Sequence, residues 1–181
     1  MLLLRKGHYE ENALPSDKAG NRQYSYTTVT TLEAICERVG DGQQYPSVQN
    51  GIDWNTSATL KLLKNHTESA VVDNGKDITF DPGGYTLTGT NRNFSGTMWD
   101  IAFTNYGALT LTGSGTISSS GATNSYAIWQ SSGKPFKMNG AIISGKTNET
   151  LVHIAGGTAE FTGGNIAVSY THLTLPTNSR V

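Results

Sequence analysis

One repeated pattern limits what this chain can fold into. Four times, an apolar–polar–apolar triplet is followed within a few residues by glycine and then by another apolar residue. The last residues of successive triplets are 31, 27 and 23 positions apart. Units of this length, separated by loops of unequal size, are typical of solenoid proteins. The triplets are Ile78-Thr-Phe80, Leu109-Thr-Leu111, Phe136-Lys-Met138 and Ala159-Glu-Phe161.

A second row of apolar residues follows the same drift. Ile101, Ile128 and Leu151 each lie eight residues before the start of a triplet. Two rows that shift together are hard to produce by chance in a chain so rich in glycine and threonine. The inward-facing side of this second strand stays open, because the alternating positions are also mostly apolar. Those alternatives are Ala127, Trp129, Val152 and Ile154.

The repeat predicts an all-β protein, a right-handed parallel β-helix (solenoid) with a short N-terminal capping helix. Each coil contains three short strands, and its backbone pairs with the coils above and below at about 4.8 Å. One coil cannot bury its inner face, whereas stacked coils place Leu111 between Phe80 and Met138 in a shared apolar column. Glycines are expected at sharp turns with positive φ. A β-sandwich is the alternative, since it also uses short strands and turns.

The domain prediction has three parts. Residues 1–25 are polar and aperiodic, so we expect a disordered or frayed N-terminal segment. Residues 26–167 form the β-helix domain, with its coils over about 59–167. Within that domain, residues 43–57 break the pattern and are interpreted as an insertion loop. No apolar run is long enough for a signal peptide or a membrane span.

The capping helix is predicted over about 31–39. Thr30 and Glu33 have the spacing of a capping box. Cys36 lies within an i, i+3, i+4, i+7 apolar pattern, and this single cysteine is interpreted as core filler rather than as a nucleophile. The pattern consists of Leu32, Ile35, Cys36 and Val39.

Several segments resemble the pectin-lyase-like β-helix repeats of large bacterial cell-surface and adhesin-like proteins. They are TTLEAICERVGDG, ATLKLLKN and ESAVVDNGKDITFDPGGYTLTGT near the start, and GALTLTGSGTIS later in the chain. The chain departs from that pattern in the insertion at 43–57 and at Asp81-Pro82, where leucine-asparagine is usual. The resemblance implies an extracellular protein attached to a bacterial surface, with its signal and anchor outside this fragment. It is specific for fold and weak for function.

The last fourteen residues resemble a translated sequencing adapter rather than natural protein. Val168–Thr177 reads VSYTHLTLPT, and a transposase-type adapter read as GTC TCT TAT ACA CAT CTG ACG CTG CCG ACG encodes the same ten residues. The adapter frame also predicts a valine followed by a stop, and the chain ends at Val181. Val168–Val181 is therefore an expected artefact. We expect the natural chain to continue beyond the repeat, which is truncated here.

The distribution of charge argues against several functions. Ile101–Ala167 contains no Asp and no Arg, although β-helix glycoside hydrolases need paired carboxylates and the lyases need acidic calcium ligands with a basic proton acceptor.

Basic residues are scattered and the net charge is −1, which gives nucleic acid no electrostatic footprint. No cofactor motif is present. Asp73, Asp77 and Asp81 recur every four residues and are weak candidates for a metal site, with turn-forming aspartates as the default interpretation.

Aromatic side chains are the candidate ligand-binding residues. A flat ring offers apolar area to the face of a sugar, so they are expected to stack on glycan, unless they fill the core column instead. The candidates are Trp99, Tyr106, Tyr126 and Trp129.

The expected function is that of a non-catalytic, secreted fragment of a bacterial surface protein, an adhesin or stalk that binds polysaccharide or a host-surface glycan. One alternative is a fragment of a β-helix polysaccharide lyase or glycoside hydrolase whose active coils lie elsewhere. Another is a phage tailspike-like fragment. No membrane insertion is expected in this fragment. Self-association is expected through the open terminal coil at Ala159–Ile166, where strand edges are left unpaired.

Overall fold

The computed structural model describes residues 32–94, 96–119, 125–131, 133–145 and 150–168. Ala34–Val181 forms one compact unit, and nearly all of Met1–Glu33 falls outside the described residues. The segment predicted to be frayed, 1–25, also lies outside them. The adapter-like segment does as well, apart from Val168, the last residue of strand β15.

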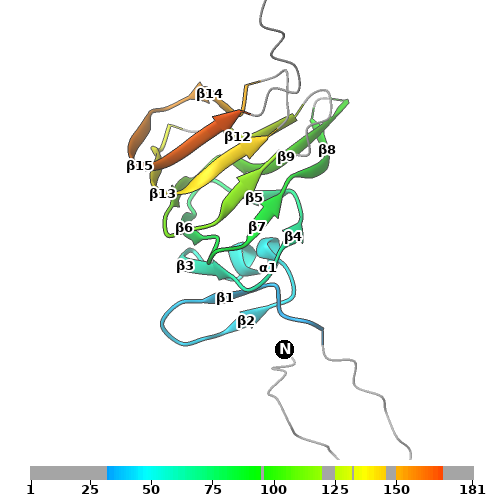
Figure 1. Cartoon of the computed structure of the whole chain (residues 1–181), viewed down its shortest axis with the longest axis vertical. Coiled ribbons are helices and arrows are strands. Elements are labelled where there is room, and N and C mark those ends of the chain that lie inside the picture. The colour runs from blue at the N-terminus through cyan, green and yellow to red at the C-terminus, as the bar shows by residue number, and fades with distance from the viewer. Residues whose placement is uncertain (1–31, 95, 120–124, 132, 146–149, 169–181) are drawn as a thin grey trace, which may run out of the picture. The chain divides into compact units, whose positions relative to one another are not determined.

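The chain is mostly β-structure in curled, largely parallel sheets, as the sequence predicted for an all-β protein (Figure 1). One short helix is found in the described residues. The elements are β1 (Cys36–Arg38), β2 (Gln44–Tyr45), α1 (Val48–Asp53), β3 (Ser57–Leu62), β4 (His66–Thr67), β5 (Ala70–Val72), β6 (Asp77–Asp81), β7 (Thr86–Thr88), β8 (Thr90–Phe94), β9 (Thr97–Asn105), β10 (Ala108–Leu111), β11 (Thr116–Ser118), β12 (Ser125–Ser131), β13 (Phe136–Gly145), β14 (Val152–Gly156) and β15 (Ala159–Val168).

The register predicted for the triplets is confirmed. Strands β3, β6, β10, β13 and β15 pair in parallel in that order, so the repeats lie side by side. Leu111 pairs with Phe80 on one side and with Met138 on the other, and Met138 pairs with Phe161. The side chains of Phe80, Leu111 and Met138 are buried, whereas Phe161 on the terminal strand is 51% exposed. The predicted apolar column is therefore present, with one end uncovered.

The same sheet bends into a second row of parallel strands. Strands β4, β7 and β11 pair in order, and β11 pairs with the second half of β13. The predicted use of glycine at turns is confirmed at Gly83, between β6 and β7, whose φ is +63° and where a Cβ would lie 2.7 Å from the Leu62 carbonyl oxygen. In this row Ile143 pairs with Ile117 and continues the core, whereas its neighbour Ile142 is 39% exposed.

The register predicted for the second apolar row is wrong. Strands β5, β9, β12 and β14 form a separate parallel sheet, but Ile128 pairs with Phe103 and Val152 rather than with Ile101 and Leu151. The sequence did not show which residues of these strands face the core, because side chains on alternate positions are both buried. Ala102 and Phe103, for example, are adjacent and both belong to the core. In the same sheet, His153 pairs with Trp129.

The helix predicted over 31–39 is also wrong. Cys36–Arg38 is strand β1, which pairs antiparallel with β2 and β3. Leu32 and Val39, expected on the buried helix face, are 67% and 51% exposed. Hydrogen bonding to the neighbouring strands outweighs the helical periodicity, because four apolar positions span only about two helical turns and isolated helices of that length are marginal.

The insertion loop predicted at 43–57 instead contains the helix that covers one end of the sheets. Helix α1 buries Val48 and Ile52 completely. Its Gly51 lies against Cys36 and Leu60, where an added Cβ would come within 3.0 Å of each side chain. Leu60 belongs to β3, the first of the stacked parallel strands. The helix therefore closes the beginning of the apolar column.

Polar side chains fix α1 in place. The Glu68 carboxylate accepts hydrogen bonds from the Val48 and Gln49 amides at 2.8 and 3.0 Å, satisfying orphan donors at the helix start. The Lys76 ammonium donates to the Ile52, Asp53 and Asn55 carbonyls at 2.8–2.9 Å, where the helix dipole favours a cation.

Candidate ligand-binding surface

Four aromatic rings gather on the sheet formed by β9, β12 and β14. The Trp99 and Tyr126 rings stack with centroids 5.1 Å apart, and Trp129 meets both of them edge-on at 6.2 and 5.2 Å. His153 stacks on Trp129 at 4.3 Å and lies 5.4 Å from Tyr126. We call Trp99, Tyr126, Trp129 and His153 the aromatic cluster. Three of the four predicted stacking residues are brought together.

Irregular strand geometry places these rings outside the main core. Ala102 and Ala127 belong to the core, and so do the residues that follow them, Phe103 and Ile128. Regular alternation would turn one residue of each pair outward, so the strands change phase here. Both the Ala127 and Ile128 amides donate to the Leu151 carbonyl, as expected at such an irregularity.

The rings cover an outer apolar layer. Ile101 is fully buried and pairs with Tyr126, yet neither belongs to the main core cluster. Thr104 pairs with Trp129 and is also fully buried. Trp99, Trp129 and His153 remain half-buried, whereas Tyr126 is buried. Trp99, Tyr126 and Trp129 therefore lie outside the core column, which was the alternative interpretation of these aromatic residues.

The hairpin formed by β8 and β9 brings a cation beside the cluster. Arg92 pairs with Trp99 in the antiparallel register of the two strands. Trp99 Nε1 and Arg92 Nε are buried without a hydrogen-bond partner in the described part of the chain. Buried donors usually have an acceptor, so these two nitrogens mark a polar contact that the described protein groups do not supply; as buried atoms they are not open to a ligand in this arrangement.

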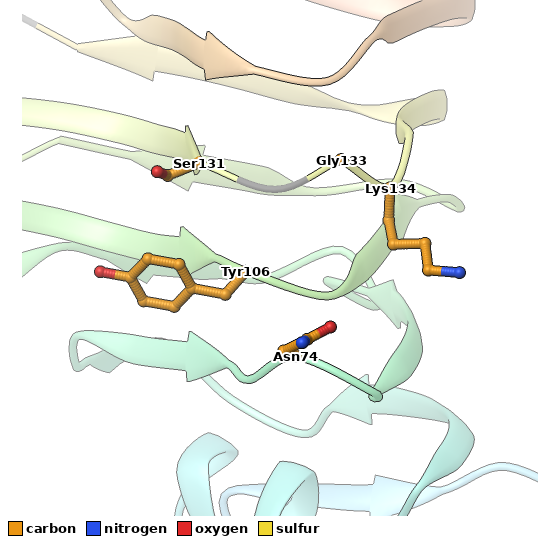
Figure 2. A pocket seen from close by; sticks show the side chains of 5 residues that line it. All are labelled: Asn74, Tyr106, Ser131, Gly133 and Lys134. Carbon is orange, nitrogen blue, oxygen red and sulfur yellow. The ribbon is translucent and has the colours of Figure 1, made fainter.

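Tyr106, the fourth predicted residue, lies elsewhere. It follows the end of β9, whereas Trp99 is near the start of that strand, roughly 20 Å away along an extended chain. Tyr106 lines an open hollow of about 510 Å³ at the turns between strands, together with Asn74, Ser131, Gly133 and Lys134 (Figure 2). Figure 2 shows the Tyr106 ring and the Lys134 amino group extending in opposite directions. The hollow therefore does not aim its side chains at one point.

A buried polar pair lies beside this hollow. Asn105 and Gln130 are fully buried in neighbouring strands, and the Asn105 amide donates to Gln130 Oε1 at 2.5 Å. Gln130 in turn donates to the Lys134 carbonyl at 2.8 Å, and Asn105 Oδ1 accepts from the Gly107 amide at 3.1 Å. These bonds hold the two turns in register, and they make the pair structural.

The three candidate aspartates do not form a metal site. Among the described residues, no group of three or more His, Cys, Asp and Glu side chains gathers as a metal would require. Asp73 and Asp77 are exposed at either end of a turn. Asp81 accepts a hydrogen bond from the Gly83 amide at 2.8 Å, the turn-forming role that was the default interpretation.

The thiol of Cys36 is not poised for chemistry. It is fully buried against α1 and donates to the Ser47 carbonyl at 3.3 Å. Burial, followed by the charges of Glu68 and Glu37, raises the pKa of Cys36 to about 12. The thiol therefore stays protonated near neutral pH, which agrees with its prediction as core filler.

The sequence missed His153 as a member of the cluster. A signal was present, because Trp129 and His153 are 24 residues apart, close to the 23-residue spacing of Met138 and Phe161.

In the described part of the chain, no helix is long and apolar enough to cross a membrane. No protein-family model, curated protein or solved structure matches the chain.

Proposed function

We propose that the chain is a non-catalytic binding scaffold, part of a secreted bacterial surface protein of the adhesin or stalk type, which contacts polysaccharide or host-surface glycan through the aromatic cluster. The observation that carries the proposal is that Trp99, Tyr126 and Trp129 gather outside the core. Together with His153 they lie on three neighbouring strands, β9, β12 and β14. Half-buried, mutually braced rings lose little conformational entropy when a ligand binds them.

The architecture proposed with this function is a right-handed parallel β-helix. Its support is the sequence repeat together with three rows of parallel strands that advance in the same chain order. The triplet row runs through Phe80, Leu111 and Met138, with one repeat per rung. Such a scaffold presents one surface from many successive rungs, which suits an extended polymer.

A glycan suits the chemistry of the cluster. Indole and phenol rings offer flat apolar area to the face of a pyranose. Arg92 pairs with Trp99 across the β8–β9 hairpin, which places a polar residue next to these rings. The absence of Asp and Arg from Ile101–Ala167 supports binding without bond cleavage.

The test is a glycan panel read out by tryptophan fluorescence. Trp129→Ala removes a half-buried ring that contacts the other three, and we expect at least a tenfold loss of affinity for any glycan the parent binds. Trp54→Ala is the matched control, because Trp54 is 62% exposed, adjoins the end of α1 and makes no ring contact with the cluster. Circular dichroism should show that both variants fold.

Two results would overturn the proposal. Equal affinity of Trp129→Ala and the parent would remove the cluster as the contact surface, as would a panel on which nothing binds. Release of reducing or unsaturated ends from any glycan would contradict the non-catalytic part.

A further inference from the structure

The two ends of the stacked sheets differ. Among the described residues, strand β15 pairs with β13 alone and β14 with β12 alone, so each is an edge strand of its sheet. Three large apolar side chains of these strands are exposed, Ile154 by 38%, Phe161 by 51% and Ile166 by 45%. Phe161 and Ile166 continue the core rows through Met138 and Ile143. In the described part of the chain, no further strand covers these two side chains.

The opposite end is closed. The Gln49 side chain on α1 accepts from the Val71 amide at 2.6 Å and donates to the Val71 carbonyl at 3.1 Å, so it occupies the edge of β5. The hairpin of β1 and β2 pairs antiparallel along β3. Helix α1 and the hairpin therefore cover the outer edges of β5 and β3. The edge strands that remain here, β2 and β4, have two residues each, too short to pair well with an incoming strand.

We propose that the open end, β14 and β15, binds a second copy of this chain tail to tail. A head-to-tail contact is obstructed because it would need the closed end. Only open end against open end remains, and such a contact is isologous and closes as a dimer without growing into a filament.

The sequence of β15 is self-complementary about a two-fold axis. With the axis between Gly163 and Gly164, antiparallel strands place Phe161 opposite Ile166 of the second copy and Ala159 opposite Val168. The register of β15 on β13 shifts in this same region, at Asn139, so the strand bends there. A two-fold axis through the bend exchanges the two limbs of the strand, which lets both limbs pair at once.

Charge does not oppose this contact. Natural edge strands are usually protected by charged residues, especially lysine. In β14 and β15 the only Asp, Glu, Lys or Arg is Glu160, whose carboxylate lies 3.3 Å from the Lys137 ammonium. The two-fold pairing places Glu160 opposite Ala167, so the two glutamates do not face each other.

The first test is sedimentation velocity of the full chain over a range of concentrations. The parent should show a monomer–dimer equilibrium, and Ile166→Lys should weaken dimerisation at least tenfold. Val39→Lys is the matched control, since Val39 is an apolar residue of similar exposure, 51% against 45% for Ile166, beside the closed end, and this variant should dimerise like the parent. A parent that stays monomeric, or one that forms ever larger polymers, would overturn the proposal.

A cross-link tests the geometry separately from the effect of a lysine on folding. The double variant Glu160→Cys with Ala167→Cys should form a disulfide-linked dimer under mild oxidation, whereas Glu160→Cys alone should not. Cross-linking by Glu160→Cys alone would indicate parallel pairing and contradict the two-fold arrangement. Neither assay involves glycan, so failure here leaves the binding proposal standing, and failure of glycan binding leaves this one standing.

Discussion

Truncating Leu111 tests the apolar column at its centre. Leu111 is fully buried between Phe80 and Met138, which are 0% and 1% exposed. The Phe80 ring is braced by an edge contact with Phe103 at 5.0 Å, so the neighbours cannot easily collapse into the space. Leucine-to-alanine changes at buried sites cost about 3–5 kcal/mol, and poor relaxation favours the upper part of that range. We expect Leu111→Ala to lower the free energy of unfolding by about 4 kcal/mol.

The same truncation at the uncovered end should cost less. Phe161 is the last member of the column and is 51% exposed. A fully buried phenylalanine would lose about 3–5 kcal/mol on truncation, so half of this, about 2 kcal/mol, is expected for Phe161→Ala. Val39→Ala, on an exposed turn, should stay within about 0.5 kcal/mol of the parent.

Urea unfolding followed by circular dichroism measures these differences. An equal dependence of the free energy of unfolding on urea concentration among the variants would show that the transitions are comparable. The protein should be dilute, so that self-association does not bury Phe161. The reasoning is refuted if Leu111→Ala costs less than Phe161→Ala, or if it costs under about 1 kcal/mol.

Three further predictions follow from polar groups. Lys76→Met removes the donor to three carbonyls at the end of α1 and should cost about 2 kcal/mol in urea unfolding; no change would show that the clamp is inert. Hydrogen bonds from Arg38 and from a backbone amide lower the pKa of Asp41 to about 2, so its stabilising effect is present above pH 3.8 and is lost as pH falls through about 2. In Arg38→Gln an NMR titration should show this pKa moving back toward 3.8, and an unmoved value would contradict the assignment. Cys36 should react with a thiol reagent at pH 8 only after unfolding, because its pKa is about 12; rapid reaction of the native protein would contradict its burial.

The triplet register was predictable because those strands have one inner face. Each triplet alternates apolar and polar residues, so the phase can be read directly from the sequence. The loops between triplets absorb the unequal spacing without shifting the phase. Phe80, Leu111 and Met138 could therefore be aligned without any knowledge of the turns.

The register of the other sheet could not be read in this way. Strands β9 and β12 are covered on both sides, by the core and by the outer aromatic layer, so their sequences have no alternation. Ala102 and Phe103 are both buried, and the change of phase between them depends on tertiary contacts. The aromatic cluster depends on that change, which explains why its members were predicted by type but not by position.

Helix α1 escaped prediction because its stability comes from distant residues. It has six residues, one of them Gly51, and isolated helices of this length do not persist. Ser47 does cap it, accepting from the Asn50 amide at 2.9 Å, so a local start signal existed. The stronger contacts come from Glu68 and Lys76, about twenty residues further along the chain.

The central claim is that successive repeats lie side by side in parallel and share one column of side chains. Nuclear Overhauser contacts of the Leu111 methyl groups test it most directly. The account predicts simultaneous cross-peaks to the Phe80 ring, 31 residues earlier, and to the Met138 methyl group, 27 residues later. Cross-peaks to neither of these, or a pattern of amide contacts showing antiparallel pairing of β10 with β13, would contradict it.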